Sequence, residues 1–106
     1  MKLVIIESPY AGDVPKNVKY ALRCLKDSIG RGEAPFASHL LYPQVLRDHV
    51  RMERNRGIVC GYNWMRVADL IAFYIDLGWS PGMRAAQEYA KALERRFELR
   101  SIVDEN

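Results

Sequence analysis

The chain has 106 residues, 49% of them hydrophobic, which is enough for one soluble domain with a single core and too short for two. Its 16 basic and 13 acidic residues give a formal net charge of +3, which suits weak attraction to phosphates but not the basic stripe of a duplex DNA binder. No apolar run approaches the roughly 20 residues of a membrane span, and residues 1–6 are too short for a signal sequence, so we expect a cytoplasmic domain that binds neither membrane nor duplex nucleic acid.

The first predicted element is a strand over Leu3–Glu7. This continuous apolar and β-branched run is typical of a strand covered on both faces of a parallel sheet. A loop over residues 8–13 follows, and Asp13 is a good N-cap. Apolar residues then recur at helical spacing over 14–29, and Gly30 predicts the end of that helix.

A second, short strand is predicted over Ala34–His39. Pro35 limits its start and cannot donate to a ladder, so we expect this strand at an edge of the sheet. A polar helical stretch is predicted over 44–67. Gly57 and Gly61 interrupt it, which predicts either two helices or one kinked helix.

The clearest strand of the chain is predicted over Asp69–Ile75, followed by a turn over 76–79. Ser80 as N-cap and Pro81 at the first helical position predict the start of the last helix. The apolar face of that helix is expected to carry Met83, Ala86, Gln87, Ala90, Leu93 and Phe97. A short final strand is predicted over Arg96–Ile102.

This alternation of strands and helices predicts an α/β fold, a three-layer sandwich around a small, mostly parallel sheet of about four strands. Ligands of such sheets bind outside the carboxyl ends of the strands, near the point where the strand order reverses. Cys24 and Cys60 both fall in apolar helical patterns and lack CxxC spacing. We therefore expect two small buried side chains in a reducing compartment, with no metal site and no cofactor.

Two loops leave the carboxyl ends of the predicted strands with chemically useful groups, residues 8–13 and residues 76–82. Free N–H groups at the helix start after Ser80 favour an anion or an ester-like oxygen, and Gly78 and Gly82 permit close approach of a ligand. The same residues also fit a plain turn with a good cap, and they form neither a Walker loop nor GxGxxG.

The loop after the first strand carries Ser8, Pro9 and Tyr10. The hydroxyl and the aromatic ring can hold a sugar hydroxyl or stack on a base, although a turn with a surface Tyr is the alternative. His39 and Tyr42 follow the second predicted strand and are expected on the same rim. A lone His is more often a structural hydrogen-bonding group than an acid or base.

Asp76 is the carboxylate expected at the ligand end, because a strand of about 20 Å separates it from Asp69. Glu88 lies about two turns into the last helix and reaches the pocket only if that helix points its first turns there; otherwise it is solvated. Arg54 is expected either at the solvated surface or donating to a ligand phosphate in bidentate fashion.

Four blocks stand in order along the chain: residues 5–10, 35–42, 53–57 and 76–83. Together they make nearly the whole chain resemble a small family of phage and bacterial proteins related to nucleoside 2-deoxyribosyltransferases. The resemblance implies a Rossmann-like, flavodoxin-like fold, a homo-oligomer and a pocket for a nucleoside or nucleotide.

In those transferases a Glu early in the last helix attacks the anomeric carbon. Here the position four residues after Gly82 is Ala86, and Glu88 lies about 200° from it around the helix. Glu88 and Asp76 are therefore catalytic candidates only if the protein is an enzyme. The residues predicted to bind the ligand are Ser8, Pro9, Tyr10, Gly12, His39, Tyr42, Arg54, Asp76, Gly78, Ser80, Gly82 and Met83.

Three functions remain open at this point. The first is a binding protein for a nucleoside or nucleotide derivative, such as a phage-encoded sponge for a nucleotide immune signal. The second is an enzyme that cleaves or exchanges an N-glycosidic bond, and the third is a purely structural oligomer. We also expect a homo-oligomer, since aromatic residues favour interfaces and one small core cannot easily hide Phe73, Tyr74, Trp79, Trp64 and Tyr89.

Overall fold

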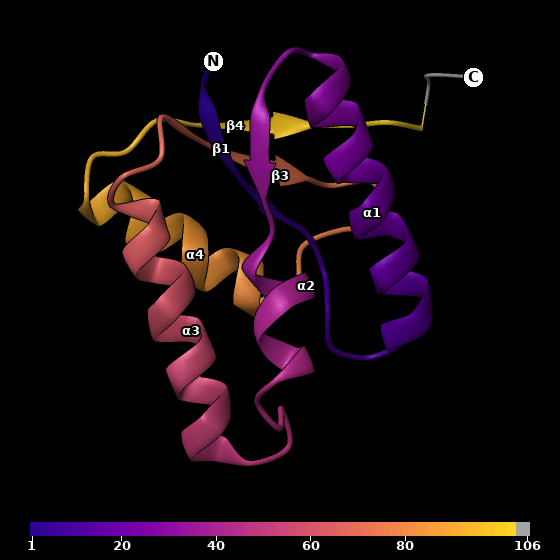
Figure 1. The fold of residues 1–106 in the computed structure, drawn as a ribbon, viewed down its shortest axis with the longest axis vertical. Coiled ribbons are helices and arrows are strands. Elements are labelled where there is room, and N and C mark those ends of the chain that lie inside the picture. The colour runs from indigo at the N-terminus through magenta and orange to yellow at the C-terminus, as the bar shows by residue number, and fades with distance from the viewer. Residues whose placement is uncertain (104–106) are drawn as a thin grey trace.

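The computed structural model describes residues 1–103 of the chain, in which strands alternate with helices (Figure 1). None of the helices within these residues is long and apolar enough to cross a membrane. The elements are, in order, β1 (Leu3–Glu7), α1 (Val14–Gly30), β2 (Ala34–Phe36), α2 (Ser38–Leu41), the 3₁₀ turn η1 (Tyr42–Gln44), α3 (Arg51–Met65), β3 (Leu70–Tyr74), α4 (Pro81–Ala92) and β4 (Phe97–Arg100).

The strands form one sheet in the order β2-β1-β3-β4, and every neighbouring pair is parallel. Val4 in β1 lies opposite Pro35 on one side and opposite Leu70 on the other. The chain moves outward from β1 to β2 and then returns to the other side of β1 to form β3. The strand order therefore reverses between β1 and β3, where sheets of this type leave room for a ligand.

Helices cover both faces of the sheet, so the predicted three-layer, Rossmann-like α/β sandwich is confirmed (Figure 1). Successive side chains of β1 point to opposite faces, as in any strand. Val4 and Ile6 pack with Tyr20 and Cys24 of α1 in one cluster. The cluster on the other face joins β1 and β3 to α3 and α4 and contains Ile5, Met65, Ala68, Ile71, Phe73, Met83, Ala86 and Ala90.

Both predicted N-caps are confirmed. A carboxylate oxygen of Asp13 accepts from the backbone N–H of Lys16 at 3.3 Å, and Ser80 Oγ accepts from that of Met83 at 3.1 Å. Each bond satisfies one of the four N–H groups that a helix start leaves without a partner. Local sequence therefore fixes where α1 and α4 begin.

The second strand is shorter than the predicted Ala34–His39. It ends at Phe36, at the edge of the sheet as expected, and the chain turns into α2 at Ser38. The backbone N–H of Leu40 donates to the carbonyl oxygen of Ala37 at 3.1 Å, which starts the helical turn. His39 therefore lies on a helix rather than at a strand end.

The helix predicted over 44–67 is also different. It begins at Arg51 and runs to Met65 as one helix, so the alternative of two helices separated at Gly57 and Gly61 is wrong. A Cβ atom at Gly61 would lie 2.8 Å from Ser38 Oγ, and one at Gly57 would lie 3.4 Å from Tyr42 Cβ. These glycines let α2 and η1 approach α3 closely, and the packing offsets their low helix propensity.

Two smaller predictions are corrected. Phe97 is the first residue of β4 and not part of the last helix, because α4 ends at Ala92. Cys24 is fully buried as expected, but Cys60 is exposed.

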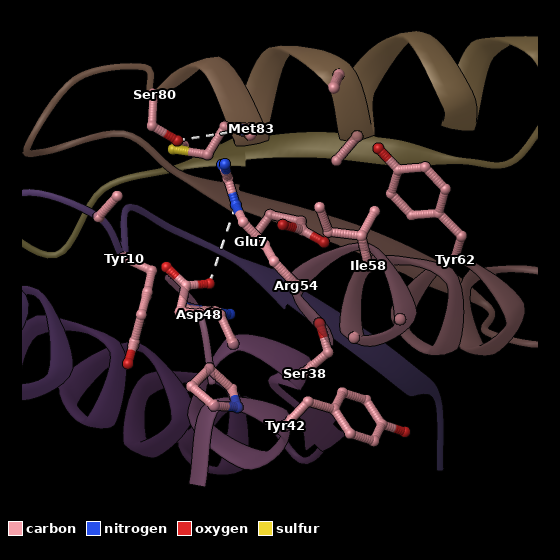
Figure 2. A pocket seen from close by; sticks show the side chains of 18 of the residues that line it. Glu7, Tyr10, Ser38, Tyr42, Asp48, Arg54, Ile58, Tyr62, Ser80 and Met83 are labelled. Atoms are coloured by element: carbon pink, nitrogen blue, oxygen red, sulfur yellow. Dashed lines mark hydrogen bonds and ion pairs between the residues drawn. The ribbon is translucent and has the colours of Figure 1, made fainter. Parts of the chain in front are cut away.

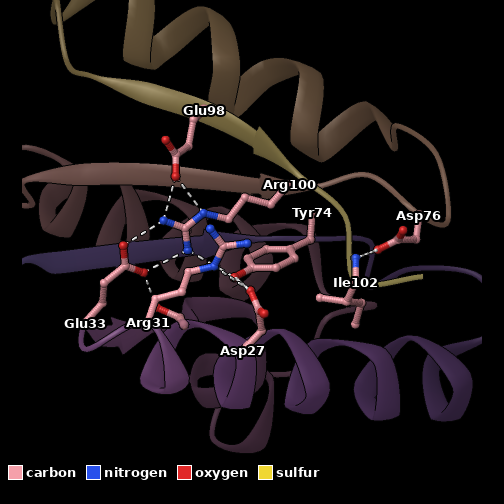
Figure 3. A network of polar contacts seen from close by, with 9 residues as sticks. Asp27, Arg31, Glu33, Tyr74, Asp76, Glu98, Arg100 and Ile102 are labelled. Carbon is pink, nitrogen blue, oxygen red and sulfur yellow. Dashed lines mark hydrogen bonds and ion pairs between the residues drawn. The ribbon is translucent and has the colours of Figure 1, made fainter. Parts of the chain in front are cut away.

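A polar network on the α1 side of the sheet is centred on Arg100, whose side chain is only 3% exposed (Figure 3). Its guanidinium donates to both carboxylate oxygens of Glu33, at 2.8 and 2.7 Å, and to Glu98 at 2.7 Å. It also donates to Tyr74 Oη at 3.1 Å, and that hydroxyl donates to Asp27 at 2.7 Å. The network ties the edge strand β4 to the residue before β2 at the opposite edge.

Candidate functional site

A cavity of about 410 Å³ lies at the predicted end of the sheet, next to the reversal of strand order. Its volume falls in the range of small-molecule sites, roughly 300–1,000 Å³. The end of β1 and the loop after it contribute one wall, and the start of α4 contributes another. The two loops singled out in the sequence therefore meet at one cavity, which α2 and α3 close from the other sides.

Most of the predicted ligand-binding residues line this cavity, and their contact with a ligand stays a prediction. Those that line it are Ser8, Tyr10, His39, Tyr42, Arg54, Ser80, Gly82 and Met83. Those that do not line it are Pro9, Gly12, Asp76 and Gly78, and the catalytic candidate Glu88 does not line it either.

Asp76 has a different position from the predicted one. Its carboxylate accepts from the Tyr20 hydroxyl at 2.6 Å and from the backbone N–H of Ile102 at 2.9 Å, and it also bonds to Ser101. These contacts hold the segment after β4 against α1 (Figure 3). The Asp76 side chain therefore stabilises the fold and does not face the cavity.

Glu88 also lies outside the cavity. Its side chain is 75% exposed, and its carboxylate lies 3.5 Å from Lys91 Nζ, one turn further along α4. Ala86, by contrast, is only 2% exposed and lines the cavity. The helical offset predicted between these two positions is thus present, and α4 presents no carboxylate to the cavity.

Glu7 is a cavity residue that the sequence interpretation missed. It ends β1, is partly buried, and directs its carboxyl group into the cavity (Figure 2). It makes no hydrogen bond or ion pair with residues 1–103, and burial raises its pKa to about 8. Its position at the carboxyl end of an otherwise apolar strand was the signal that could have identified it.

Ser8 and His39 form a hydrogen-bonded pair, with 2.7 Å between Ser8 Oγ and His39 Nε2. Burial lowers the pKa of His39 to about 4, so the ring is neutral at pH 7. Its Nδ1 atom is buried without a partner among the described residues, so no carboxylate orients the ring as in a catalytic triad. The pair therefore suits hydrogen bonding to a ligand better than nucleophilic attack.

Arg54 and the start of α4 make one side of the cavity suitable for an anion. Arg54 is 56% exposed, and its Nε lies 3.9 Å from Asp48 Oδ1, a loose contact that a ligand can replace. Figure 2 shows its guanidinium extending toward Ser80 and Met83. The free N–H groups of the first turn of α4 add partial positive charge on that side.

The other side of the cavity is aromatic and apolar. Tyr62 stacks on Tyr89 with ring centroids 4.2 Å apart and 18° between the ring planes, and Ile58 lies beside it. Tyr42 accepts a hydrogen bond from Trp64 Nε1 at 2.8 Å, which fixes its ring on the rim. A flat heterocyclic ring fits such a wall.

Much of the lining was missed because it comes from one face of α3. Positions 54, 57, 58, 61 and 62 all line the cavity and recur at intervals of three and four residues, a signal that was present in the sequence. The lining residues that were not predicted are Glu7, Ala11, Ser38, Pro43, Leu46, Asp48, Glu53, Gly57, Ile58, Gly61, Tyr62, Pro81, Ala85 and Ala86. Within residues 1–103, no group of three or more His, Cys, Asp or Glu side chains is placed to hold a metal ion.

Comparison with known proteins gives a family and a similar structure. A family model described as a domain of unknown function, DUF7768, matches residues 2–100. A 2-desoxiribosyltransferase from Leishmania mexicana has a similar fold, with a TM-score of 0.61 and 17% sequence identity. The match covers 95% of this chain and 65% of that chain, so this chain spans less than two thirds of the transferase's length. The predicted resemblance to that family is confirmed at the level of the fold, and no curated protein matches.

Proposed function

Because this chain belongs to the family described as a domain of unknown function, DUF7768, we propose its function from the cavity itself: it binds a nucleoside or nucleotide. One observation carries the proposal. A single cavity places an available guanidinium and a helix start on one side and a stacked tyrosine pair on the other. A phosphate group binds to positively charged and N–H donor groups, and a base binds to a flat aromatic surface. The fold is also similar to that of a protein named a 2-desoxiribosyltransferase.

Binding without chemistry is the function we favour. The α4 residues that line the cavity, Ala86 among them, carry no carboxylate, and Glu88 is ion-paired in solvent. The Glu7 carboxyl is neutral at pH 7, and a neutral acid is a poor nucleophile. None of these three positions therefore supplies an ionised carboxylate at the cavity.

The proposal is tested by calorimetry with a panel of deoxynucleosides and their 5′-monophosphates, and by mass spectrometry of small molecules that co-purify with the native protein. Arg54→Met should weaken the monophosphates by about 10- to 100-fold, since a hydrogen bond to a charged group contributes roughly 1.5–3 kcal/mol. The affinity for the nucleosides, which carry no phosphate, should not change. Arg56→Met is the matched control, because Arg56 is also exposed on α3 but does not line the cavity. Absence of binding by the whole panel would contradict the proposal.

A second candidate function is cleavage of the N-glycosidic bond, and the position of Glu7 favours it. A neutral Glu7 can give its proton to the leaving base while the oxygen of a water molecule bonds to the anomeric carbon, whose bond to the base nitrogen breaks. The proton that this water loses returns to the Glu7 carboxylate, so the acid is restored. Chromatography of the same panel after long incubation separates the two functions. Free base released by the wild type and by Glu88→Gln, but not by Glu7→Gln, would favour the enzyme. We expect every nucleoside to be recovered intact.

A protein that binds a nucleotide without converting it lowers the free concentration of that nucleotide. We propose such a sponge role against a nucleotide immune signal during phage infection, by analogy with the fold only. The ligand recovered from cells decides this point, since a canonical mononucleotide as the main bound species would contradict it.

We also propose that the protein forms a homo-oligomer, but the residues that support this proposal differ from the aromatic residues named in the sequence analysis. Phe73 and Tyr74 are fully buried within the chain, so they add nothing to an interface. Some of the exposed apolar side chains lie on and after α3, where Met52 is 76% exposed, Trp64 48% and Val67 61%. Sedimentation velocity at micromolar concentration tests the proposal, and a monomer would contradict it.

A further inference from the structure

Glu7 is the one carboxyl group that enters the cavity from the sheet. Its backbone is fixed by pairing of β1 with β3, where Glu7 lies opposite Phe73, and Figure 2 shows its side chain pointing into the same space as Arg54, Ile58 and Tyr62. No residue among 1–103 bonds to its carboxyl oxygens, so their hydrogen-bonding capacity is directed at whatever fills the cavity.

We propose that the Glu7 carboxyl recognises the nucleobase of the ligand, donating one hydrogen bond to a ring nitrogen and accepting another from the adjacent amino group. This inference rests on the proposed function and deepens it. It makes an amino-bearing base, adenine or cytosine, the class of ligand, and it makes binding depend on the protonation of a single side chain.

The groups around Glu7 leave its carboxyl unpaired. On α3, Tyr62 faces it closely enough for the Glu7 charge to contribute to the raised pKa of Tyr62, after the larger effect of burial. Arg54, also on α3, is paired with Asp48, not with Glu7. The remaining titratable groups that line the cavity are Tyr10, His39, Tyr42 and Glu53; among them His39 is neutral and bonded to Ser8, and Glu53 is bonded to Arg47. The lining residues of α4 carry no charge.

The chemistry of the carboxyl group then decides what it can bind. A neutral carboxyl has one O–H donor and an acceptor oxygen, whereas an ionised one has acceptors only. Adenine and cytosine each place an amino donor beside an acceptor nitrogen, which matches the neutral form. Burial keeps Glu7 in that form, with a pKa of about 8. Ile58 and Tyr62 lie beside the carboxyl as a wall for the flat face of the base.

The test is calorimetry with deoxyadenosine and deoxycytidine at pH 6.5 and pH 9, because the bases of these two nucleosides do not titrate in that interval. With a pKa of about 8, roughly one chain in eleven is still neutral at pH 9, so wild-type affinity should fall about tenfold. Glu7→Gln keeps one donor and one acceptor without a titratable proton, so it should bind at pH 6.5 and lose the pH dependence. Glu7→Ala should bind weakly at both values, and Glu88→Gln should behave as the wild type.

The outcomes separate this inference from the function on which it rests. Binding by the wild type that is equal at both pH values, or Glu7→Gln that is as pH-dependent as the wild type, overturns the role of Glu7 and leaves the binding function standing. Binding of neither nucleoside at pH 6.5, while other members of the panel bind, overturns the role of Glu7 and leaves the binding function standing. Absence of binding by the whole panel overturns both. Circular dichroism at both pH values confirms that each variant is folded, and a ¹³C titration of the Glu7 carboxyl near its ordinary pKa would also overturn the inference.

Discussion

Replacing Glu7 by Gln should stabilise the protein, and increasingly so as the pH rises. The pKa of Glu7 is raised from 4.5 to about 8 in the folded chain, so folding favours the protonated form. Any stabilisation from this group is therefore complete below pH 4.5 and is lost as the pH rises toward 8. At about 1.36 kcal/mol per pH unit, the wild type loses up to about 2.7 kcal/mol relative to Glu7→Gln between pH 5.5 and 7.5.

Water that enters the cavity reduces this limit, so we expect a difference of about 1–2 kcal/mol over that interval. Urea unfolding of the wild type and Glu7→Gln at pH 5.5, 6.5 and 7.5, without any ligand, measures it. Glu88→Gln is the control, since Glu88 is exposed and its removal should leave the pH dependence unchanged. Parallel stability curves for the wild type and Glu7→Gln would refute the argument, because they would mean that the carboxyl is ionised in the folded chain.

Three further predictions concern the fold around the cavity, each measured by urea unfolding. Gly61→Ala should lower the free energy of unfolding by about 1–3 kcal/mol, because its Cβ would lie 2.8 Å from Ser38 Oγ of α2. Gly57→Ala should leave that free energy unchanged or raise it by up to about 1 kcal/mol through helix propensity. The opposite order of the two variants would contradict the close packing. Ser80→Ala should cost about 1 kcal/mol through loss of the α4 cap, and an unchanged stability would mean that the cap is redundant. Arg100→Met should cost roughly 3–5 kcal/mol, because it leaves the partly buried Glu33 carboxylate without its main partner. Adding Glu33→Met should recover part of the loss, and purely additive costs would refute that reasoning.

Features that depend on neighbours in sequence were the predictable ones. Asp13 and Ser80 cap helices within three residues of themselves, so their roles can be inferred from composition and spacing. The apolar run of β1 likewise indicates a strand buried on both faces. The order of these elements then predicts the parallel sheet and the end of it at which the cavity lies.

Features that depend on distant parts of the chain were not predictable in this way. Gly61 indicates a helix break until Ser38 is seen packed against it, 23 positions earlier in the sequence. Asp76 stands at the ligand end of β3, but Tyr20 and the segment after β4 occupy its carboxylate. Glu7 was hidden for the opposite reason, since an acidic residue that ends an apolar run does not by itself indicate whether it faces solvent or a cavity.

Because one cysteine is exposed and the other fully buried, their rates of modification by a thiol reagent can report the opening motions of the chain. A thiol-specific reagent has direct access to Cys60 in the native state. Cys24 is enclosed between α1 and the sheet, and burial raises the pKa of its thiol to about 12, so almost no reactive thiolate exists until that helix moves away. The rate at Cys60 therefore calibrates the reagent, while the rate at Cys24 reports how often α1 opens from the sheet, with no engineered label.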